Sequence, residues 1–148
     1  MTEEQVTKII LEWLLNSNWI IVSFDFPQSG TGKILHPNDS LSEKNKGSIN
    51  PDIIAVKETI CLFFENKGYF YYSDFLKQYN LINNNDYSND IEKLLKDYNI
   101  KNIYYGIGMP SEKHSQRSVN SAYLVDFIIG VNKQNKIDIL FNKYNISI

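Results

Sequence analysis

The sequence predicts an α/β or α+β domain built around one β-sheet. A helical pattern opens the chain, three β-rich runs follow it, and further helical patterns separate these runs from the later strands. The 148 residues, of which 43% are hydrophobic, are enough for one domain with a buried core. We therefore expect residues 1–148 to form a single domain.

Composition narrows the class of protein. No run approaches the roughly 18 apolar residues that a membrane span needs. The chain begins with Glu3 and Glu4 rather than with a basic segment, so we expect no signal peptide. The only cysteine, Cys61, excludes an internal disulfide, and these features together predict a cytoplasmic protein. The net charge of −2 gives no overall basic footprint, although it leaves room for a local basic patch.

The first predicted helix has a clear start. Thr2 is a suitable N-cap, and Gln5 completes a capping box with it. Apolar residues then recur at helical spacing, namely Val6, Ile9, Ile10, Trp13 and Leu14. We expect this helix to end near residues 17–18 and a buried strand over 19–26 to stop at Pro27.

A long polar segment precedes the next two strands. Residues 27–50 are rich in turn formers and predict a loop, and loops of this length are often functional. Two short β runs, 52–56 and 59–65, follow it. Their spacing predicts a hairpin that turns at Lys57-Glu58.

The second half alternates helices and strands. We expect helices over 71–80 and 88–98, the second of them capped by Ser88 or Asn89. The later segments are predicted as a strand (102–110), a polar loop (111–121) and two strands (122–131 and 136–141) joined by a turn at 132–135.

Strand periodicity brings two carboxylates and a lysine together. Alternate strand residues face the same side, so Glu65 and Lys67 share a face. A hairpin that is symmetric about residues 57–58 pairs Asp52 with Phe63, which places Asp52 diagonally beside Glu65, with backbones about 7–8 Å apart. Any turn of even length keeps this parity.

Charged residues at the end of an apolar strand need compensation. Pairing or metal coordination is the usual remedy for buried charge. Two carboxylates at this spacing can share one Mg²⁺ ion, whose oxygen ligands lie at about 2.0–2.1 Å. The alternative is an ordinary surface pair of Glu65 and Lys67 beside a turn that starts at Pro51-Asp52.

Pro51-Asp52 and Glu65-Asn66-Lys67 resemble the motif of the PD-(D/E)XK nuclease superfamily, which includes type II restriction endonucleases and Holliday junction resolvases. The resemblance implies a restriction-endonuclease-like fold with a central mixed β-sheet flanked by helices. It also implies that Asp52, Glu65 and the Asn66 carbonyl bind Mg²⁺, for which Mn²⁺ can substitute. Lys67 would then orient or deprotonate the water that attacks a phosphodiester.

Many members of this superfamily add a glutamate from the first helix. Glu3 fits best, because it lies on the inward stripe with Val6, Ile10 and Trp13, and Glu4 is the reserve candidate. The alternative is that both residues only place favourable charge at a helix N-terminus.

Two polar segments carry the candidate contacts to nucleic acid. These are Gln28, Ser29, Thr31 and Lys33 in the first segment, and Lys113, His114, Gln116 and Arg117 in the second. Arginine can bind guanine bidentately and glutamine can bind adenine in the same way, whereas the alternative is two solvated loops. We expect Tyr69, Tyr71 and Tyr72 to be packing residues rather than a platform for stacked bases.

The resemblance favours a Mg²⁺-dependent DNA endonuclease most like a small type II restriction enzyme. Such an enzyme would act on double-stranded DNA as a homodimer, because one site cuts one strand. One alternative is a structure-specific nuclease of the junction-resolving or repair kind. The other is a catalytically idle nuclease-fold binding subunit.

Overall fold

The computed structural model describes residues 1–26, 30–39 and 47–148. Its elements are, in order, α1 (Glu3–Asn16), β1 (Ile20–Phe24), β2 (Ile53–Lys57), β3 (Ile60–Asn66), α2 (Tyr72–Asn83), α3 (Ser88–Leu95), β4 (Asn102–Pro110), α4 (Ser111–Asn120), the 3₁₀ helix η1 (Ala122–Leu124), β5 (Phe127–Val131) and β6 (Ile137–Asn142). Within these ranges, no helix is long and apolar enough to cross a membrane.

One mixed sheet organises the fold. Its strands lie in the order β1-β2-β3-β4-β5-β6. The pairs β3–β4 and β4–β5 are parallel, and the remaining pairs are antiparallel. Parallel neighbours need crossover connections, and here α2 with α3, and then α4 with η1, provide them. The predicted fold class, a mixed α/β domain with a central mixed sheet flanked by helices, is confirmed.

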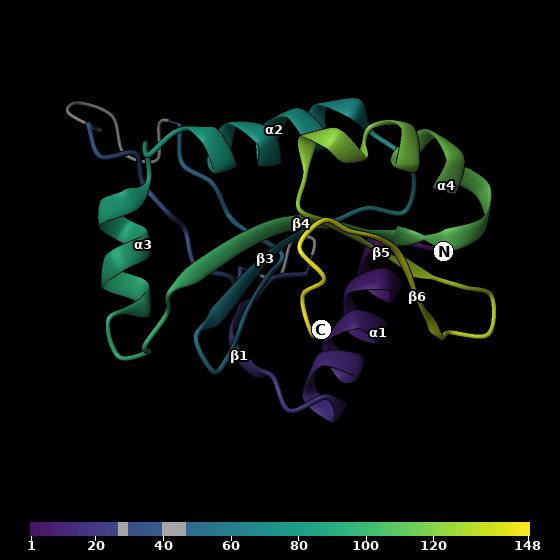
Figure 1. The fold of residues 1–148 in the computed structure, drawn as a ribbon, viewed down its shortest axis with the longest axis horizontal. Helices are drawn as coiled ribbons and strands as arrows, with labels where there is room; N and C mark the ends of the chain where they lie inside the picture. The colour runs from purple at the N-terminus through teal and green to yellow at the C-terminus, as the bar shows by residue number, and fades with distance from the viewer. Residues whose placement is uncertain (27–29, 40–46) are drawn as a thin grey trace.

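Helices cover both faces of the sheet (Figure 1). On one face α1 packs through Val6, Ile10 and Leu14, which are fully buried against β2, β3 and β5. On the other face, α3 packs on β2 and β3, and α2 packs on β4 and β5. The predicted capping box of α1 is confirmed, since Thr2 and Gln5 each accept a hydrogen bond from the other's backbone N–H.

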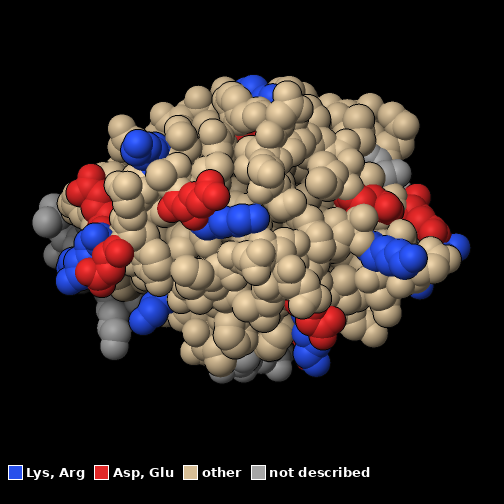
Figure 2. All heavy atoms as spheres, turned by 60° about the horizontal axis from the view of Figure 1, so that its bottom comes forward, with Lys and Arg blue, Asp and Glu red and all other residues tan. Residues whose placement is uncertain are grey.

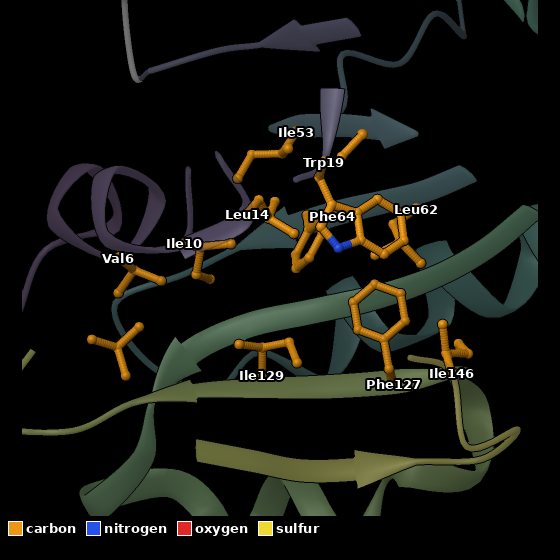
Figure 3. Close-up of a cluster of buried hydrophobic side chains, with 12 residues drawn as sticks. Val6, Ile10, Leu14, Trp19, Ile53, Leu62, Phe64, Phe127, Ile129 and Ile146 are labelled. Carbon is orange, nitrogen blue, oxygen red and sulfur yellow. The ribbon is translucent and has the colours of Figure 1, made fainter. Parts of the chain in front are cut away.

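Aromatic rings fill the centre of the core under α1 (Figure 3). The rings of Phe64 and Phe127 meet edge to face, with centroids 4.9 Å apart, and both side chains are fully buried. Gly106 of β4 makes room for this pair, because a Cβ atom there would lie 2.2 Å from ring atoms of Phe127. The close approach of strand to ring explains why this position is a glycine.

The β2–β3 hairpin turns one residue later than the sequence predicts. Lys57 pairs with Ile60, so the turn is Glu58-Thr59, and Glu58 has a positive φ of 55°. The prediction of a turn at Lys57-Glu58 is therefore wrong. Both turns contain two residues, so the strand faces are as predicted.

Most of the predicted polar loop 111–121 is instead helix α4, which spans Ser111–Asn120. Helix α4 packs through small side chains: Ser111 and Ser118 are buried, and the Ser118 hydroxyl donates to Met109 Sδ at 2.6 Å. A face made of serines carries no apolar periodicity, which is why the pattern indicated a loop. The predicted strand over 122–131 is likewise shorter, because Ala122–Leu124 form η1.

Candidate active site

Asp52 and Glu65 lie side by side at one end of the sheet. The last pair of the β2–β3 ladder is Ile53 with Phe64, and just beyond it the Asp52 N–H donates to the Phe64 carbonyl at 3.0 Å. The predicted pairing of Asp52 with Phe63 is wrong because the turn is shifted and Phe63 pairs with Ile54, but Asp52 and Glu65 are still close enough to interact electrostatically. Their exposed fractions are only 8% and 7%.

The environment of Asp52 disfavours its charged form. Burial and the adjacent Glu65 raise the pKa of Asp52 to about 8, although the Asn66 N–H donates to its Oδ2 at 2.6 Å and works in the opposite direction. Two carboxyl groups that share a buried position cannot both ionise without a compensating cation. A perturbed pair of this kind is a candidate functional site.

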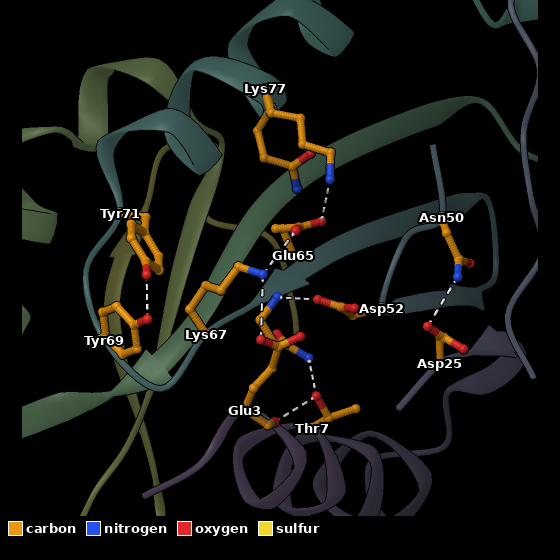
Figure 4. Close-up of polar contacts among 12 residues, drawn as sticks. Glu3, Thr7, Asp25, Asn50, Asp52, Glu65, Lys67, Tyr69, Tyr71 and Lys77 are labelled. Carbon is orange, nitrogen blue, oxygen red and sulfur yellow. Dashed lines mark hydrogen bonds and ion pairs between the residues drawn. The ribbon is translucent and has the colours of Figure 1, made fainter. Parts of the chain in front are cut away.

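Lysines compensate Glu65 from two sides (Figure 4). Lys67 Nζ lies 3.5 Å from Glu65 Oε1, and Lys77 Nζ lies 3.1 Å from Glu65 Oε2. Lys67 Nζ also lies 3.4 Å from Glu3 Oε2. Burial lowers the pKa of Lys67, but the carboxylates around it more than offset this effect, so the pKa is raised overall.

The first helix contributes Glu3 and not Glu4. Glu4 forms an exposed i,i+4 pair with Lys8 at 3.2 Å. Glu3 is held in place through Thr7, whose hydroxyl donates to the Glu3 carbonyl at 2.9 Å and accepts from Asn66 Nδ2 at 3.1 Å. These bonds tie the first turn of α1 to the end of β3, so the structure brings Glu3, Asp52, Glu65 and Lys67 together.

Helix α2 adds two residues that were not predicted. Lys77 pairs with Glu65, and Asp74 is a partly buried carboxylate that interacts electrostatically with Lys67, Glu65 and Glu3. Asp74 Oδ2 is buried and has no hydrogen-bond partner among the described residues. The available signal was their spacing of three in a helix that begins soon after Lys67, which sets both on one helix face.

Asp74→Asn is expected to lower the pKa of Lys67, because it removes one of the negative charges that raise it. The change in unfolding free energy should stay below about 1 kcal/mol, since the amide keeps the shape of the side chain. NMR titration of the Lys67 side chain checks this. The exposed, distant Asp97→Asn is the matched control, and an equal Lys67 titration in both variants would show that Asp74 does not act on Lys67.

The donor set suits a hard cation only if the backbone takes part. Among residues 1–26, 30–39 and 47–148, no group of three or more His, Cys, Asp and Glu side chains is arranged to hold a metal ion. The predicted ligands are two carboxylates, Asp52 and Glu65, with the main-chain carbonyl of Asn66 as the third. Oxygen donors of this type match Mg²⁺, which usually takes few protein ligands and keeps several waters.

The nucleic-acid residues predicted in the first polar segment are partly described. The Thr31 hydroxyl donates to the Phe24 carbonyl at 3.1 Å, and the Lys33 N–H donates to Ser23 Oγ at 3.0 Å. Both bonds anchor the segment to β1. Gln28 and Ser29 lie outside the described residues, and a role of this segment in binding stays a prediction.

The second polar group lies on α4. Gln116 donates to Asn120 within the helix at 3.2 Å, and Arg117 is exposed. The side chains of Lys113 and His114 lie outside the described part of the structure. Figure 2 looks at the molecule from the side at the bottom of Figure 1, where α1 lies, and shows Lys and Arg scattered among Asp and Glu without an extended basic patch. The described residues of this face therefore do not form the electrostatic footprint expected of a surface that binds duplex DNA.

Comparisons with protein-family models, with curated proteins and with solved structures find no match for this chain.

Proposed function

We propose that this chain is a Mg²⁺-dependent endonuclease that hydrolyses phosphodiester bonds in DNA. The observation that carries the proposal is the buried pair of Asp52 and Glu65, with Lys67 beside it, at the end of two neighbouring strands. A buried carboxylate pair of this kind has a strong electrostatic demand for a cation.

A metal ion would be held by Asp52, Glu65 and the Asn66 carbonyl. The fit rests on the two adjacent carboxylates and on the raised pKa of Asp52, which a divalent cation would reverse. Once bound, the ion would supply Lewis-acid stabilisation and a more acidic water, and Mn²⁺ would substitute for Mg²⁺. Glu65 would have to exchange its contact with Lys77 for the ion, and the 39% exposure of the Lys77 side chain leaves it free to move away.

Lys67 would act as a positively charged positioning group rather than as a base. Its raised pKa keeps the ammonium protonated at neutral pH. A protonated amine donates hydrogen bonds, so it can orient a water molecule and stabilise negative charge that develops on a phosphate. Glu3 would hold the ammonium in place through the 3.4 Å contact.

Partners and location follow from the same proposal. A restriction-type enzyme would cut both strands of duplex DNA as a homodimer in the cytoplasm, in agreement with the single buried cysteine, Cys61. A structure-specific nuclease is the second candidate, and the exposed aromatic surface described below favours it. A catalytically idle binding subunit fits less well, because the set Asp52, Glu65 and Lys67 is complete.

The proposal is tested by incubating the purified protein with plasmid, a four-way junction and single-stranded DNA, each with Mg²⁺ and with EDTA. We expect Mg²⁺-dependent cleavage of at least one substrate and its loss in Lys67→Ala. Discrete plasmid fragments support the restriction type, and symmetric junction cuts support a resolvase. Absence of Mg²⁺-dependent cleavage, or equal cleavage by Lys67→Ala, overturns the assignment.

A further inference from the structure

Four exposed tyrosines lie next to the candidate active site. This tyrosine cluster consists of Tyr69, Tyr71, Tyr72 and Tyr123, with exposed fractions of 49%, 42%, 46% and 68%. The prediction that the first three are packing residues is wrong, because Phe70 takes the inward position and packs on Phe75 at 5.3 Å between ring centroids. Exposed aromatic side chains that gather beside a candidate active site form a candidate binding surface.

The side chains of the cluster contact one another in two pairs, Tyr69 with Tyr71 and Tyr72 with Tyr123. Tyr69 and Tyr71 have ring centroids 4.5 Å apart, and their hydroxyls are hydrogen-bonded to each other. The hydroxyls of Tyr72 and Tyr123 lie 3.5 Å apart, which links the start of α2 to η1. Side chains ordered in this way lose less entropy when a ligand covers them.

Two tyrosines of the cluster lie directly beside Lys67 of the candidate active site. Tyr69 follows Lys67 by two residues, and Figure 4 shows Tyr69 and Tyr71 beside the Lys67 side chain. Tyr71 is close enough to Lys67 and Asp74 to interact with both electrostatically. A ligand that lies across these rings therefore extends to the reacting groups.

The local charge favours stacking over attraction of phosphates. The cations at this place, Lys67 and Lys77, are already paired with Glu65 and Glu3. Aromatic rings stack on the faces of nucleobases of any sequence. In a continuous duplex those faces are covered by the neighbouring base pairs, and a side chain must unstack a base step to reach them, whereas unpaired bases are directly accessible to a protein ring.

We propose that the tyrosine cluster is a stacking platform for unpaired nucleobases, and that the substrate of the adjacent site is single-stranded or branched nucleic acid rather than continuous duplex. The binding part of this inference stands on the cluster alone. The substrate part rests on the proposed nuclease function.

Binding is measured in EDTA, so that no cleavage is needed. The probes are labelled oligonucleotides of about 12 nucleotides: a single strand, the blunt duplex, and the single strand with abasic sites in its centre. We expect the single strand to bind at least about tenfold more tightly than the duplex or the abasic strand. Tyr69→Leu and Tyr71→Leu should each weaken it about fivefold or more, whereas Tyr69→Phe and the distant, exposed Tyr144→Leu should not.

Equal binding of single strand and abasic strand, or no effect of the leucine variants, overturns the platform. Light scattering shows whether the wild type is a dimer and whether Tyr71→Leu is a monomer. A monomeric variant that still binds nucleic acid as well as the wild type would show that the cluster is a protein interface, and this result also overturns the platform. Tyrosine-dependent binding without Mg²⁺-dependent cleavage would keep the platform and refute the nuclease. Mg²⁺-dependent cleavage that prefers duplex and is unchanged in the leucine variants would support the nuclease and refute the platform.

Discussion

Asp52→Asn is expected to lower Mg²⁺-dependent cleavage at least about a thousandfold and, at pH 8, to make the metal-free protein more stable by about 1–3 kcal/mol. Activity falls because the amide cannot supply a charged ligand. Stability rises because the variant removes a buried acid whose ionisation is disfavoured, while the amide oxygen can still accept the Asn66 N–H. A substitution that keeps the shape of the side chain would thus lower activity and raise stability, and such a trade-off is typical of active-site residues.

The stability gain should depend on pH. The pKa of Asp52 is raised to about 8 in the folded state, against about 3.9 for an unfolded aspartate, so between these values the folded state binds the extra proton. The unfolding free energy of the wild type must therefore decrease as the pH rises from about 4 to 8. Asp52→Asn lacks this contribution, so the stability difference between variant and wild type should widen over that range.

Urea unfolding in EDTA at several pH values measures this difference, and cleavage assays measure activity. Asp126→Asn is the matched control, because Asp126 is also a buried acid with a raised pKa that accepts a backbone N–H, from Tyr105 at 2.9 Å. This control should keep its cleavage activity within about threefold. A parallel pH dependence in wild type and Asp52→Asn would contradict the stability argument, and an active Asp52→Asn would contradict the site.

Gly106→Ala is expected to destabilise the fold by about 1–3 kcal/mol. The new Cβ would lie 2.2 Å from ring atoms of Phe127, which is itself fully buried against Phe64. Close-packed interiors cannot absorb such an overlap without moving a strand or a ring. Urea unfolding of the purified variant measures the loss.

A double-mutant cycle isolates the cause. Phe127→Leu alone should destabilise because it removes ring contacts, but it also clears space beside Gly106. The double variant should therefore be more stable than the sum of the two single effects predicts, with a coupling on the order of 1 kcal/mol or more. Additive effects would show that the alanine is accommodated in another way.

The sequence predicted those features of the fold that are set by residues close to one another along the chain. The capping box at Thr2 and Gln5 needs only a spacing of three, and the shared face of Asp52 and Glu65 needs only strand parity. The position of the hairpin turn was missed because Glu58 takes a positive φ, which its residue type does not favour. The cap of α3 was missed because it comes from far away: Asn38 Oδ1 accepts from the Asn89 N–H at 3.0 Å.

Some residues of the candidate site could likewise be predicted from the sequence, and others could not. Glu3, Asp52, Glu65 and Lys67 follow from strand and helix periodicity. Asp74 and Lys77 depend on where α2 crosses the sheet, which is a tertiary property. The exposure of the tyrosines was missed because Phe70 alone takes the inward position.

The bond from Asn66 to Thr7 also constrains when the site can form. It joins residues 59 positions apart, and the Lys67–Glu3 contact spans 64. Contacts of such long range require closure of a large loop and tend to form late in folding. During synthesis the first helix emerges long before the strand that completes its acidic site. Glu3 can therefore join Asp52, Glu65 and Lys67 only after the hairpin has formed and α1 has docked on the sheet, so the Lys67–Glu3 contact reports that docking.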